Sequence, residues 1–358
     1  MANYDPTLLA QAQAAKAASR KLAGLSTTTK NAALEAIAVA LIDRQDEILA
    51  ANEQDVERAR DAGLADAPLN RLRLTPDKLA GIAADVRTVA RLPDPVGEVI
   101  DGWKLPNGLN VSRRRVPLGV LGAIFESRPN VTIDIAALCL KSGNACVIRG
   151  GSEAIRSNTV LARVAREAET SAGVPEGALQ LIENTDRALV AQLLEMREYI
   201  DIVVPRGGAE LINFVASNAR MPVLTGGVGV CHTYVDATAD LDKAEAIAFN
   251  AKTRNWSICN ALDTLIVHRE VAAEFLPSIA SRWSAAGALP MTSSVAGLID
   301  SSHDRLSLST NLPPINIRSA SVIHFAIALP SETPRDCPRL YKGAADCQVV
   351  TISQTTVT

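Results

Sequence analysis

A regular alternation of short apolar runs and longer amphipathic runs between residues 118 and 217 most constrains the fold of this chain. Each short run has the length and composition of a buried strand, and each is followed by apolar residues at helical spacing. The predicted strands are Gly119–Phe125, Ala145–Ile148, Leu179–Ile182 and Ile200–Val204, and the helices are Val131–Lys141, Ser152–Ser171, Asp186–Met196 and Gly208–Ser217. This order predicts a doubly wound, parallel α/β sheet covered on both faces.

Glycines and arginines follow two of these strands, at the edge where parallel sheets bind ligands. Arg149-Gly150-Gly151 follows the second strand, and Arg206-Gly207-Gly208 follows the fourth. Backbone N–H groups at a helix start and an arginine fork suit a phosphate, although a tight turn also explains each glycine pair. Two such loops at one edge favour a nucleotide site. A third loop, Thr225–Gly229, lies between predicted strands at Pro222–Leu224 and 230–235.

Helices and a hairpin are predicted ahead of the sheet. Helix-start signals occur at Asp5-Pro6, Ser26 and Thr75-Pro76, the last opening a helix through Val89. The segment Glu98–Val116 alternates around Pro106-Asn107-Gly108 and predicts a hairpin. The three arginines that end it, Arg113–Arg115, fit either a solvated charged face or an oligomer contact.

Cys259 lies between a run of helical spacing, Ala239–Asn250, and a strand-like run, Leu262–His268. A thiol on such a loop is a candidate nucleophile, but most free cysteines are small buried apolar residues. The six cysteines include no Cys-x-x-Cys pair and the four histidines no pair at helical spacing, so we expect neither a disulfide framework nor a metal site.

Composition excludes several classes of protein. The net charge of −3 argues against nucleic-acid binding. No run approaches the ~20 apolar residues that span a bilayer, and the N-terminus lacks a signal pattern, so we expect a cytoplasmic protein without a membrane partner. The length of 358 residues predicts two domains.

Several motifs together resemble the γ-glutamyl phosphate reductase family of the aldehyde dehydrogenase superfamily. They are Arg114–Val131, Leu140-Lys-Ser-Gly-Asn144, Arg149–Gly151, Pro205–Gly208, Thr225–His232, and Asn250–Thr253 with Cys259-Asn260. The resemblance runs in order to about Ala286. It implies an aldehyde-dehydrogenase-like fold, with a doubly wound, Rossmann-like NADP-binding domain at residues 1–250 and a hairpin arm at about 97–116 for oligomerisation. A second α/β catalytic domain begins at 251–286 and is incomplete.

The resemblance also implies roles for single residues. Cys259 is the expected nucleophile, and Asn130 with the backbone N–H of Cys259 the expected oxyanion hole. The expected NADPH-binding residues are Arg149, Gly150, Gly151, Arg206, Gly207, Gly208, Thr225, Gly226 and Gly227. No motif identifies the residues that hold the substrate's amino-acid group, and Arg128 and Lys252 are guesses.

The activity that the resemblance implies is the NADPH-dependent reduction of L-glutamyl 5-phosphate to L-glutamate 5-semialdehyde, with functional coupling to glutamate 5-kinase. Hydrolytic aldehyde dehydrogenases carry a glutamate base where this chain has Val223-Leu224-Thr225, and the absence of that base suits a reductase. Two alternatives stay open: a family member that binds nucleotide without catalysis, and a general aldehyde dehydrogenase.

The segment 287–358 does not match the family. It is rich in serine, threonine and proline, and the alternation of strands and helices fades there. We interpret it as read in a shifted frame or as disordered; the alternative is a divergent fold with a strand or buried segment at Ser321–Leu329. Either case removes motifs that complete the catalytic domain, so the homo-oligomer expected for the family is in doubt for this chain.

Overall fold

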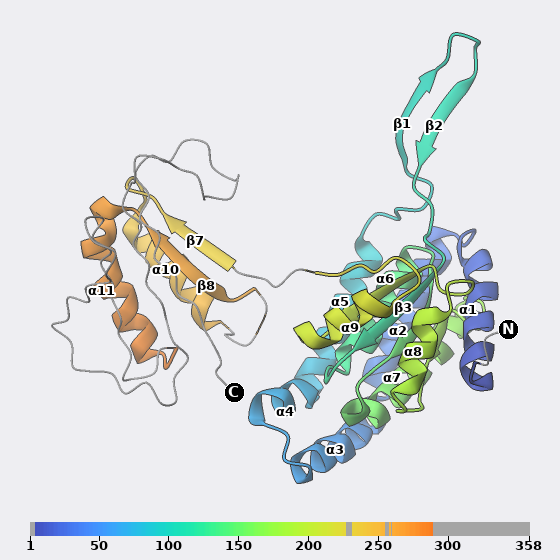
Figure 1. Ribbon diagram of the computed structural model, residues 1–358, viewed down its shortest axis with the longest axis horizontal. Helices are drawn as coiled ribbons and strands as arrows, with labels where there is room; N and C mark the ends of the chain where they lie inside the picture. Colours follow the sequence, from blue (N-terminus) through green and yellow to red (C-terminus); the bar gives the residue numbers. More distant parts are fainter. Residues whose placement is uncertain (1–3, 227–230, 255–257, 259, 289–358) are drawn as a thin grey trace. The chain divides into compact units, whose positions relative to one another are not determined.

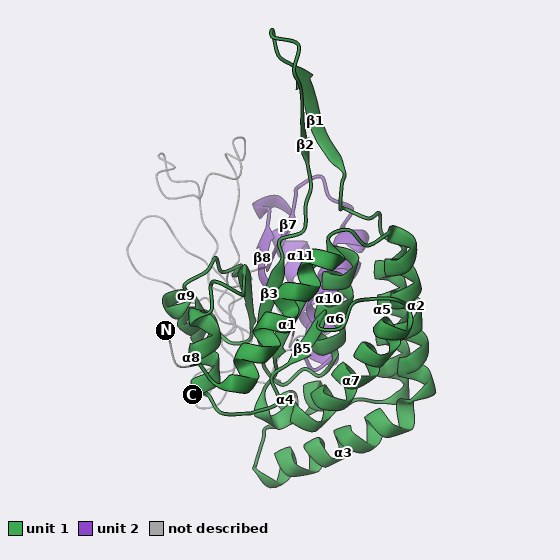
Figure 2. Ribbon diagram, turned by 90° about the vertical axis from the view of Figure 1, so that its right-hand side faces the viewer, with its two compact units in different colours: residues 1–225 green, residues 226–358 purple. Residues whose placement is uncertain are grey.

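The computed structural model describes residues 4–226, 231–254, 258 and 260–288. Two compact units divide the chain, residues 1–225 and 226–358 (Figure 2). The division falls at Thr225, earlier than the domain boundary at residue 250 expected from the sequence, because strand β7 (Cys231–Val235) pairs with β8 (Leu262–Val267). The expectations for the segment 289–358 lie outside the described residues.

The first unit contains the predicted parallel sheet, so the doubly wound fold is confirmed. Its strand order is β5-β4-β3-β6, and all neighbours run parallel. Continuous apolar composition produces strands that are buried on both faces. The strands are β3 (Val120–Phe125), β4 (Ala145–Arg149), β5 (Leu179–Leu181) and β6 (Ile202–Arg206). The predicted strand at Pro222–Leu224 is wrong, since Val223 forms only an isolated bridge with Val203.

Helices cover both faces of this sheet. Helices α6 (Asn130–Lys141) and α7 (Ile155–Ser171), the latter after the 3-10 turn η1 (Ser152–Ala154), connect β3, β4 and β5. Helix α8 (Ala188–Glu195) crosses back to β6, so it lies on the opposite face. Helix α1 (Pro6–Leu22) shares that face, because Asp5 N–H donates to Gln192 of α8 at 2.7 Å. Helix α9 (Ala209–Asn218) follows β6.

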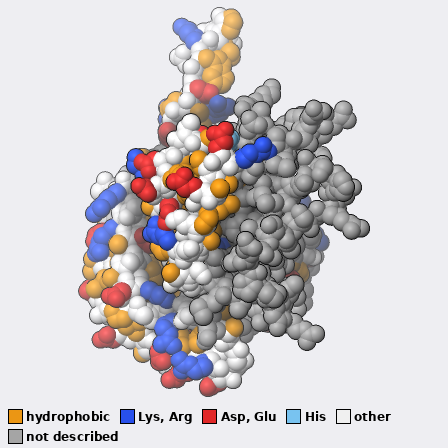
Figure 3. Space-filling model, turned by 90° about the vertical axis from the view of Figure 1, so that its left-hand side faces the viewer, with side chains coloured by type: hydrophobic (Ala, Val, Ile, Leu, Met, Phe, Trp, Pro, Cys, Tyr) orange, Lys and Arg blue, Asp and Glu red, His pale blue; other side chains and the backbone are white. Residues whose placement is uncertain are grey.

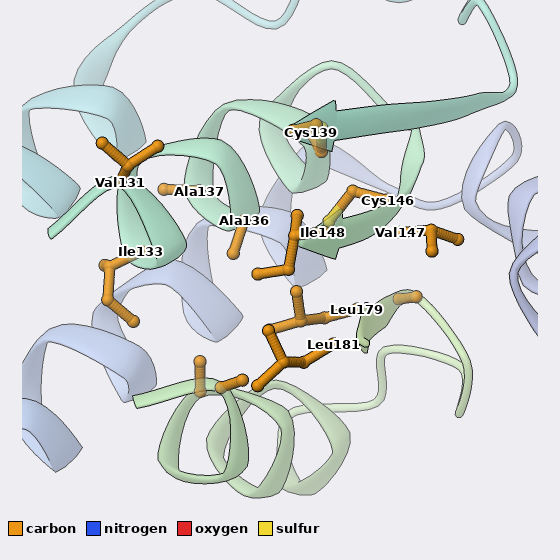
Figure 4. Packing of buried hydrophobic residues seen from close by; sticks show 14 of the residues in the cluster. Val131, Ile133, Ala136, Ala137, Cys139, Cys146, Val147, Ile148, Leu179 and Leu181 are labelled. Carbon is orange, nitrogen blue, oxygen red and sulfur yellow. The ribbon is translucent and has the colours of Figure 1, made fainter. Parts of the chain in front are cut away.

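One part of the core of the first unit lies between α6, α7 and the sheet (Figure 4). Cys139 of α6 and Cys146 of β4 are free thiols that are buried there and hydrogen-bonded to each other, and this contact together with burial raises the pKa of the Cys146 thiol. Glu169 of α7 is nearby and only 3% exposed. Burial raises the pKa of its carboxyl from 4.5 to about 8, and Arg166 only weakly opposes this. A neutral acid is therefore part of this core at neutral pH.

Helices α2 (Thr27–Asp43), α3 (Gln45–Asp61), α4 (Asp66–Leu72) and α5 (Pro76–Arg91) form an outer layer (Figure 1). The helix starts predicted at Asp5-Pro6, Ser26 and Thr75 are confirmed, since each cap side chain accepts backbone N–H groups. The layer is fixed to the chain ahead of the hairpin by a buried ion pair. Lys30 Nζ lies 3.0 Å from Asp94, and their side chains are 0% and 11% exposed.

The predicted hairpin consists of β1 (Val99–Lys104) and β2 (Asn110–Arg114), which pair antiparallel and project from the first unit (Figure 1). Its apolar side chains Val99 and Trp103 are half exposed. Hydrophobic side chains are visible at the surface of the projecting hairpin in Figure 3. Of the terminal arginines, Arg113 pairs with Asp101 and Arg115 with Glu98. These two charges are therefore paired within the arm itself.

The second unit has a parallel pair of strands and two helices. Helices α10 (Leu241–Thr253) and α11 (Arg269–Ala285) pack with β7 and β8 around Phe275 and Trp283. Predicted elements at Ala239–Asn250 and Leu262–His268 are confirmed within a few residues. In the parts of the chain that the structure describes, no helix is both long and apolar enough to cross a membrane.

Candidate active site

The carboxyl ends of β3 and β6 form the point where the order of the sheet reverses. From β3 the chain adds β4 and β5 on one side, and it then returns to place β6 on the other side of β3. Phe125, the last residue of β3, is in register with Arg206, the last residue of β6. Ligands of open α/β sheets bind at such a reversal. The two loops that leave it, 126–129 and 207–208, therefore define the candidate site.

Glu126 connects these two loops. Its backbone N–H donates to the carbonyl of Arg206 at 3.3 Å, and its carboxylate accepts the backbone N–H of Gly208 at 3.0 Å. An added Cβ at Gly207 would lie 2.6 Å from the Glu126 carboxyl carbon. The carboxylate thus sits at the N-terminus of α9, where the helix dipole favours an anion.

A second carboxylate fixes the loop after β3. Glu153 Oε1 accepts both the N–H and the hydroxyl of Ser127, at 2.7 and 2.5 Å. Burial acts to raise the pKa of Glu153, but hydrogen bonds from Ser127 and from the Glu153 backbone, with the charge of Arg149, outweigh it and lower the pKa. Glu153 is therefore an anion at neutral pH.

The glycines of the predicted cofactor loops differ in what surrounds them. An added Cβ would lie 2.1 Å from Asn158 Nδ2 at Gly150 and 2.2 Å from Glu153 Oε1 at Gly151, so both positions are filled by side chains of the protein. At Gly208 and Gly226 such an atom would meet nothing within 4 Å. Gly208 and Gly226 thus have room for a ligand beside them, whereas Gly150 and Gly151 do not.

The donor set at the reversal fits a dinucleotide. Helix α9 begins at Gly208, an exposed glycine whose own N–H is taken by the Glu126 carboxylate and which has no side chain to cap the helix. The N–H groups of the first turn, residues 209–211, therefore remain for an anion. Arg206 is exposed beside it. Arg149 is at the end of β4, where its guanidinium donates to the carbonyl of Thr185 at 2.9 Å and burial lowers its pKa. Both predicted arginines therefore lie at the carboxyl edge of the sheet.

Asn130 is the first residue of α6, at the end of the Glu126 loop. Its amide does not cap the helix, as a short amide at this point commonly does. Instead Nδ2 donates to Asp134 Oδ2 at 2.9 Å. Burial raises the pKa of Asp134 against the lowering effect of this bond. Arg128 is partly buried in the same loop.

In the second unit, Lys252 is 5% exposed and its Nζ donates to the carbonyl of Leu262 at 2.9 Å. Burial lowers its pKa, while the charge of Asp263 opposes this. Cys259 and Gly227 lie outside the described residues. Among the described residues, no group of three or more histidine, cysteine, aspartate or glutamate side chains is arranged to hold a metal ion.

Sequence reasoning missed Glu126 and Glu153. Both are acidic residues close to a predicted phosphate loop, where a carboxylate is unexpected next to an anionic ligand. That conflict between charge and expected ligand was the signal available in the sequence.

The parallel sheet, with its order reversed at β3 and the loops that leave that point, defines a doubly wound α/β protein. A model of the aldehyde dehydrogenase family matches residues 6–302, beyond the point near Ala286 where the motif resemblance ends, and the chain belongs to this family. Family membership implies a nicotinamide cofactor.

Curated relatives share the reductase name. The γ-glutamyl phosphate reductase of Roseiflexus castenholzii is 58% identical over 268 residues, which are 74% of this chain and 63% of that protein. The enzyme of Halothermothrix orenii is 54% identical over 269 residues, or 75% and 64% of the two chains. The chain thus spans less than two thirds of the length of these relatives.

Solved structures give the same result for the fold. The crystal structure of γ-glutamyl phosphate reductase from Thermotoga maritima has a TM-score of 0.72 and 45% identity, and the match covers 78% of this chain and 68% of that one. An acetylating aldehyde dehydrogenase from Geobacillus thermoglucosidasius has a TM-score of 0.58 at 21% identity, covering 77% and 58%. The latter likeness concerns the fold alone.

Proposed function

We propose that this chain catalyses the NADPH-dependent reduction of L-glutamyl 5-phosphate to L-glutamate 5-semialdehyde and phosphate, the second step of proline biosynthesis from glutamate. The observation that carries the proposal is the 58% identity to a γ-glutamyl phosphate reductase over 268 residues. The open donor groups at the reversal of the sheet support it. Coupling to glutamate 5-kinase, a homo-oligomer and a cytoplasmic location belong to the same proposal.

In this proposal Cys259 is the nucleophile. Its thiolate attacks the acyl carbon, phosphate leaves, and a thioester forms. The amide of Asn130 and the backbone N–H of Cys259 donate to the oxygen that gains charge during the attack. Bound NADPH supplies the hydride that reduces the thioester. The resulting thiohemiacetal then releases the aldehyde and regenerates the thiol.

The proposed reaction needs no water as a nucleophile. The segment Val223-Leu224-Thr225 carries no carboxylate that could activate a water molecule against the thioester. A reductase keeps its thioester for hydride only if no such base is present. Arg128 and Lys252 remain our proposals for the residues that hold the amino-acid end of the substrate.

The cofactor is proposed to use the carboxyl edge of the sheet. First-turn N–H groups of α9 after Gly207-Gly208 would hold the diphosphate, and Arg206 would add a positive charge. Arg149 would pair with the 2′-phosphate of NADPH. Gly150 and Gly151 would shape the loop that follows Arg149. Thr225, Gly226 and Gly227 complete the proposed set of cofactor-binding residues.

The test is the reverse reaction, phosphate-dependent reduction of NADP⁺ by glutamate semialdehyde. Cys259→Ala should abolish turnover and leave NADP⁺ affinity unchanged, because only the thiol is lost. Cys139→Ala is the matched control and should keep turnover, since Cys139 is buried in α6. Turnover by Cys259→Ala would refute the proposal. NAD⁺-dependent oxidation without phosphate would identify a general aldehyde dehydrogenase, and nucleotide binding without turnover by the wild type would identify a non-catalytic family member.

A further inference from the structure

Ser127 has an unusual backbone conformation. Among the described residues it is the one non-glycine residue with a positive φ, at 30°. The left-handed region is unfavourable for residues with a Cβ, and such strain persists only where the surroundings impose it. Ser127 lies between β3 and Asn130, in the loop that leaves the reversal of the sheet.

The surroundings of Ser127 supply the constraint through one carboxylate oxygen. Both the N–H and the Oγ of Ser127 donate to Glu153 Oε1, at 2.7 and 2.5 Å. Hydrogen bonds to a charged acceptor are stronger than neutral ones. Glu153 belongs to η1, which follows the next strand of the sheet. The contact therefore ties two loops together.

Gly151 makes this contact sterically feasible. A Cβ at this position would lie 2.2 to 2.6 Å from all three atoms of the Glu153 carboxyl group. The side chain of Glu153 thus folds back over Gly151 to reach Ser127. The glycine is explained by this path, so it does not require a phosphate in the same place.

We propose that Glu153 is a positioning residue that holds Ser127 in the left-handed conformation and thereby fixes the loop that presents Asn130. Glu153 acts through Ser127 and does not touch the reacting atoms. The inference rests on the proposed function only for its kinetic consequence. The positional part stands on the contacts of Ser127 alone.

The experiment uses strain relief. Glu153→Ala removes the acceptor, so Ser127 returns to a right-handed conformation and the loop shifts. We expect kcat to fall on the order of 10²-fold, the cost of a small misplacement near the chemistry. Glycine adopts the left-handed conformation without a steric penalty. The double variant Glu153→Ala with Ser127→Gly should therefore recover most of the lost kcat, and Glu153→Gln, which keeps an acceptor oxygen, should lose little.

Hydrogen exchange provides a readout that is independent of activity. The amides of Val131 and Thr132 donate to the carbonyls of Arg128 and Pro129, so they report on the end of the loop. Their exchange should accelerate in Glu153→Ala and return to the wild-type rate in the double variant. A purely stabilising role of Glu153 predicts no rescue by glycine.

The outcomes are distinct. Wild-type exchange in Glu153→Ala, or no recovery of exchange in the double variant, overturns the inference. Restored exchange together with a wild-type chain that lacks reductase turnover supports the inference while the proposed function fails. If Glu153→Ala does not fold, the double variant is compared with Glu153→Gln. Equal exchange rates of the Val131 and Thr132 amides in the two variants support the inference, and faster exchange in the double variant overturns it.

Discussion

Replacing Glu169 by glutamine should change how the stability of the first unit depends on pH. Glu169 lies on the buried face of α7, and burial raises the pKa of its carboxyl from 4.5 to about 8. Between these two values the folded chain holds a proton that the unfolded chain releases. The contribution of Glu169 to the free energy of unfolding is therefore fully present below about pH 4.5 and is lost as the pH rises towards 8.

The size of the effect follows from the two pKa values. A tenfold change in proton affinity corresponds to ~1.4 kcal/mol, so the loss of stability approaches ~5 kcal/mol above pH 8. Glutamine keeps the shape and carries no charge at any pH. Its buried amide costs about 1–3 kcal/mol if it finds no acceptor. The variant should thus be no more stable than the wild type at pH 5 and more stable at pH 8.5.

Hydrogen exchange of the β4 and α7 amides measures this free energy of opening in the first unit alone. Exchange rates, corrected for their intrinsic pH dependence, should show the decline for the wild type between pH 5 and 8.5, and a flatter profile for Glu169→Gln. Glu167→Gln is the matched control, since Glu167 is exposed on the same helix and pairs with Arg44 and Arg163. Equal slopes in wild type and Glu169→Gln would refute the reasoning.

Three further predictions concern the site and its support. Arg149→Ala should weaken NADPH binding more than NADH binding, and an unchanged ratio of the two dissociation constants would assign the preference to another residue. Glu126→Gln should strengthen NADP⁺ binding about 2- to 10-fold, because it removes the negative charge at the α9 N-terminus; calorimetry showing weaker binding would contradict this. Gly119→Ala should destabilise the first unit by about 2–4 kcal/mol in urea unfolding, since φ is 119° and the new Cβ would lie 2.1 Å from Asp201 Oδ2; an unchanged midpoint would count against it.

The sheet was predictable because its signal is local and repeated. Continuous apolar strands such as Gly119–Phe125 require cover on both faces, and the amphipathic runs between them supply it. Capping residues such as Ser26 and Thr75 mark helix starts by a single hydrogen bond, which is why those starts match the structure. Asn130 and the loops at Gly150-Gly151 and Gly207-Gly208 follow strands of this sheet, so the sequence also predicts that they lie at its carboxyl edge.

The contacts within the site were not predictable, because they join residues distant in sequence. Glu153 reaches back to Ser127, and Glu126 reaches forward to Gly208. Periodicity carries no information about such pairs. Gly150 and Gly151 show the consequence, since a phosphate loop and a loop filled by Asn158 and Glu153 look alike in sequence. What distinguishes them is the direction of side chains from other elements.

The buried ion pair between Lys30 and Asp94, ahead of the hairpin, responds to salt differently from the exposed ion pairs of the hairpin itself. At the root, the pair is shielded from water, so counterions screen it little. In the half of the hairpin nearer this root, the pairs Arg113–Asp101 and Arg115–Glu98 are about half exposed and weaken as salt is added. In concentrated salt the attachment of the chain ahead of the hairpin to α2 therefore persists, while the two exposed pairs contribute little to the arm.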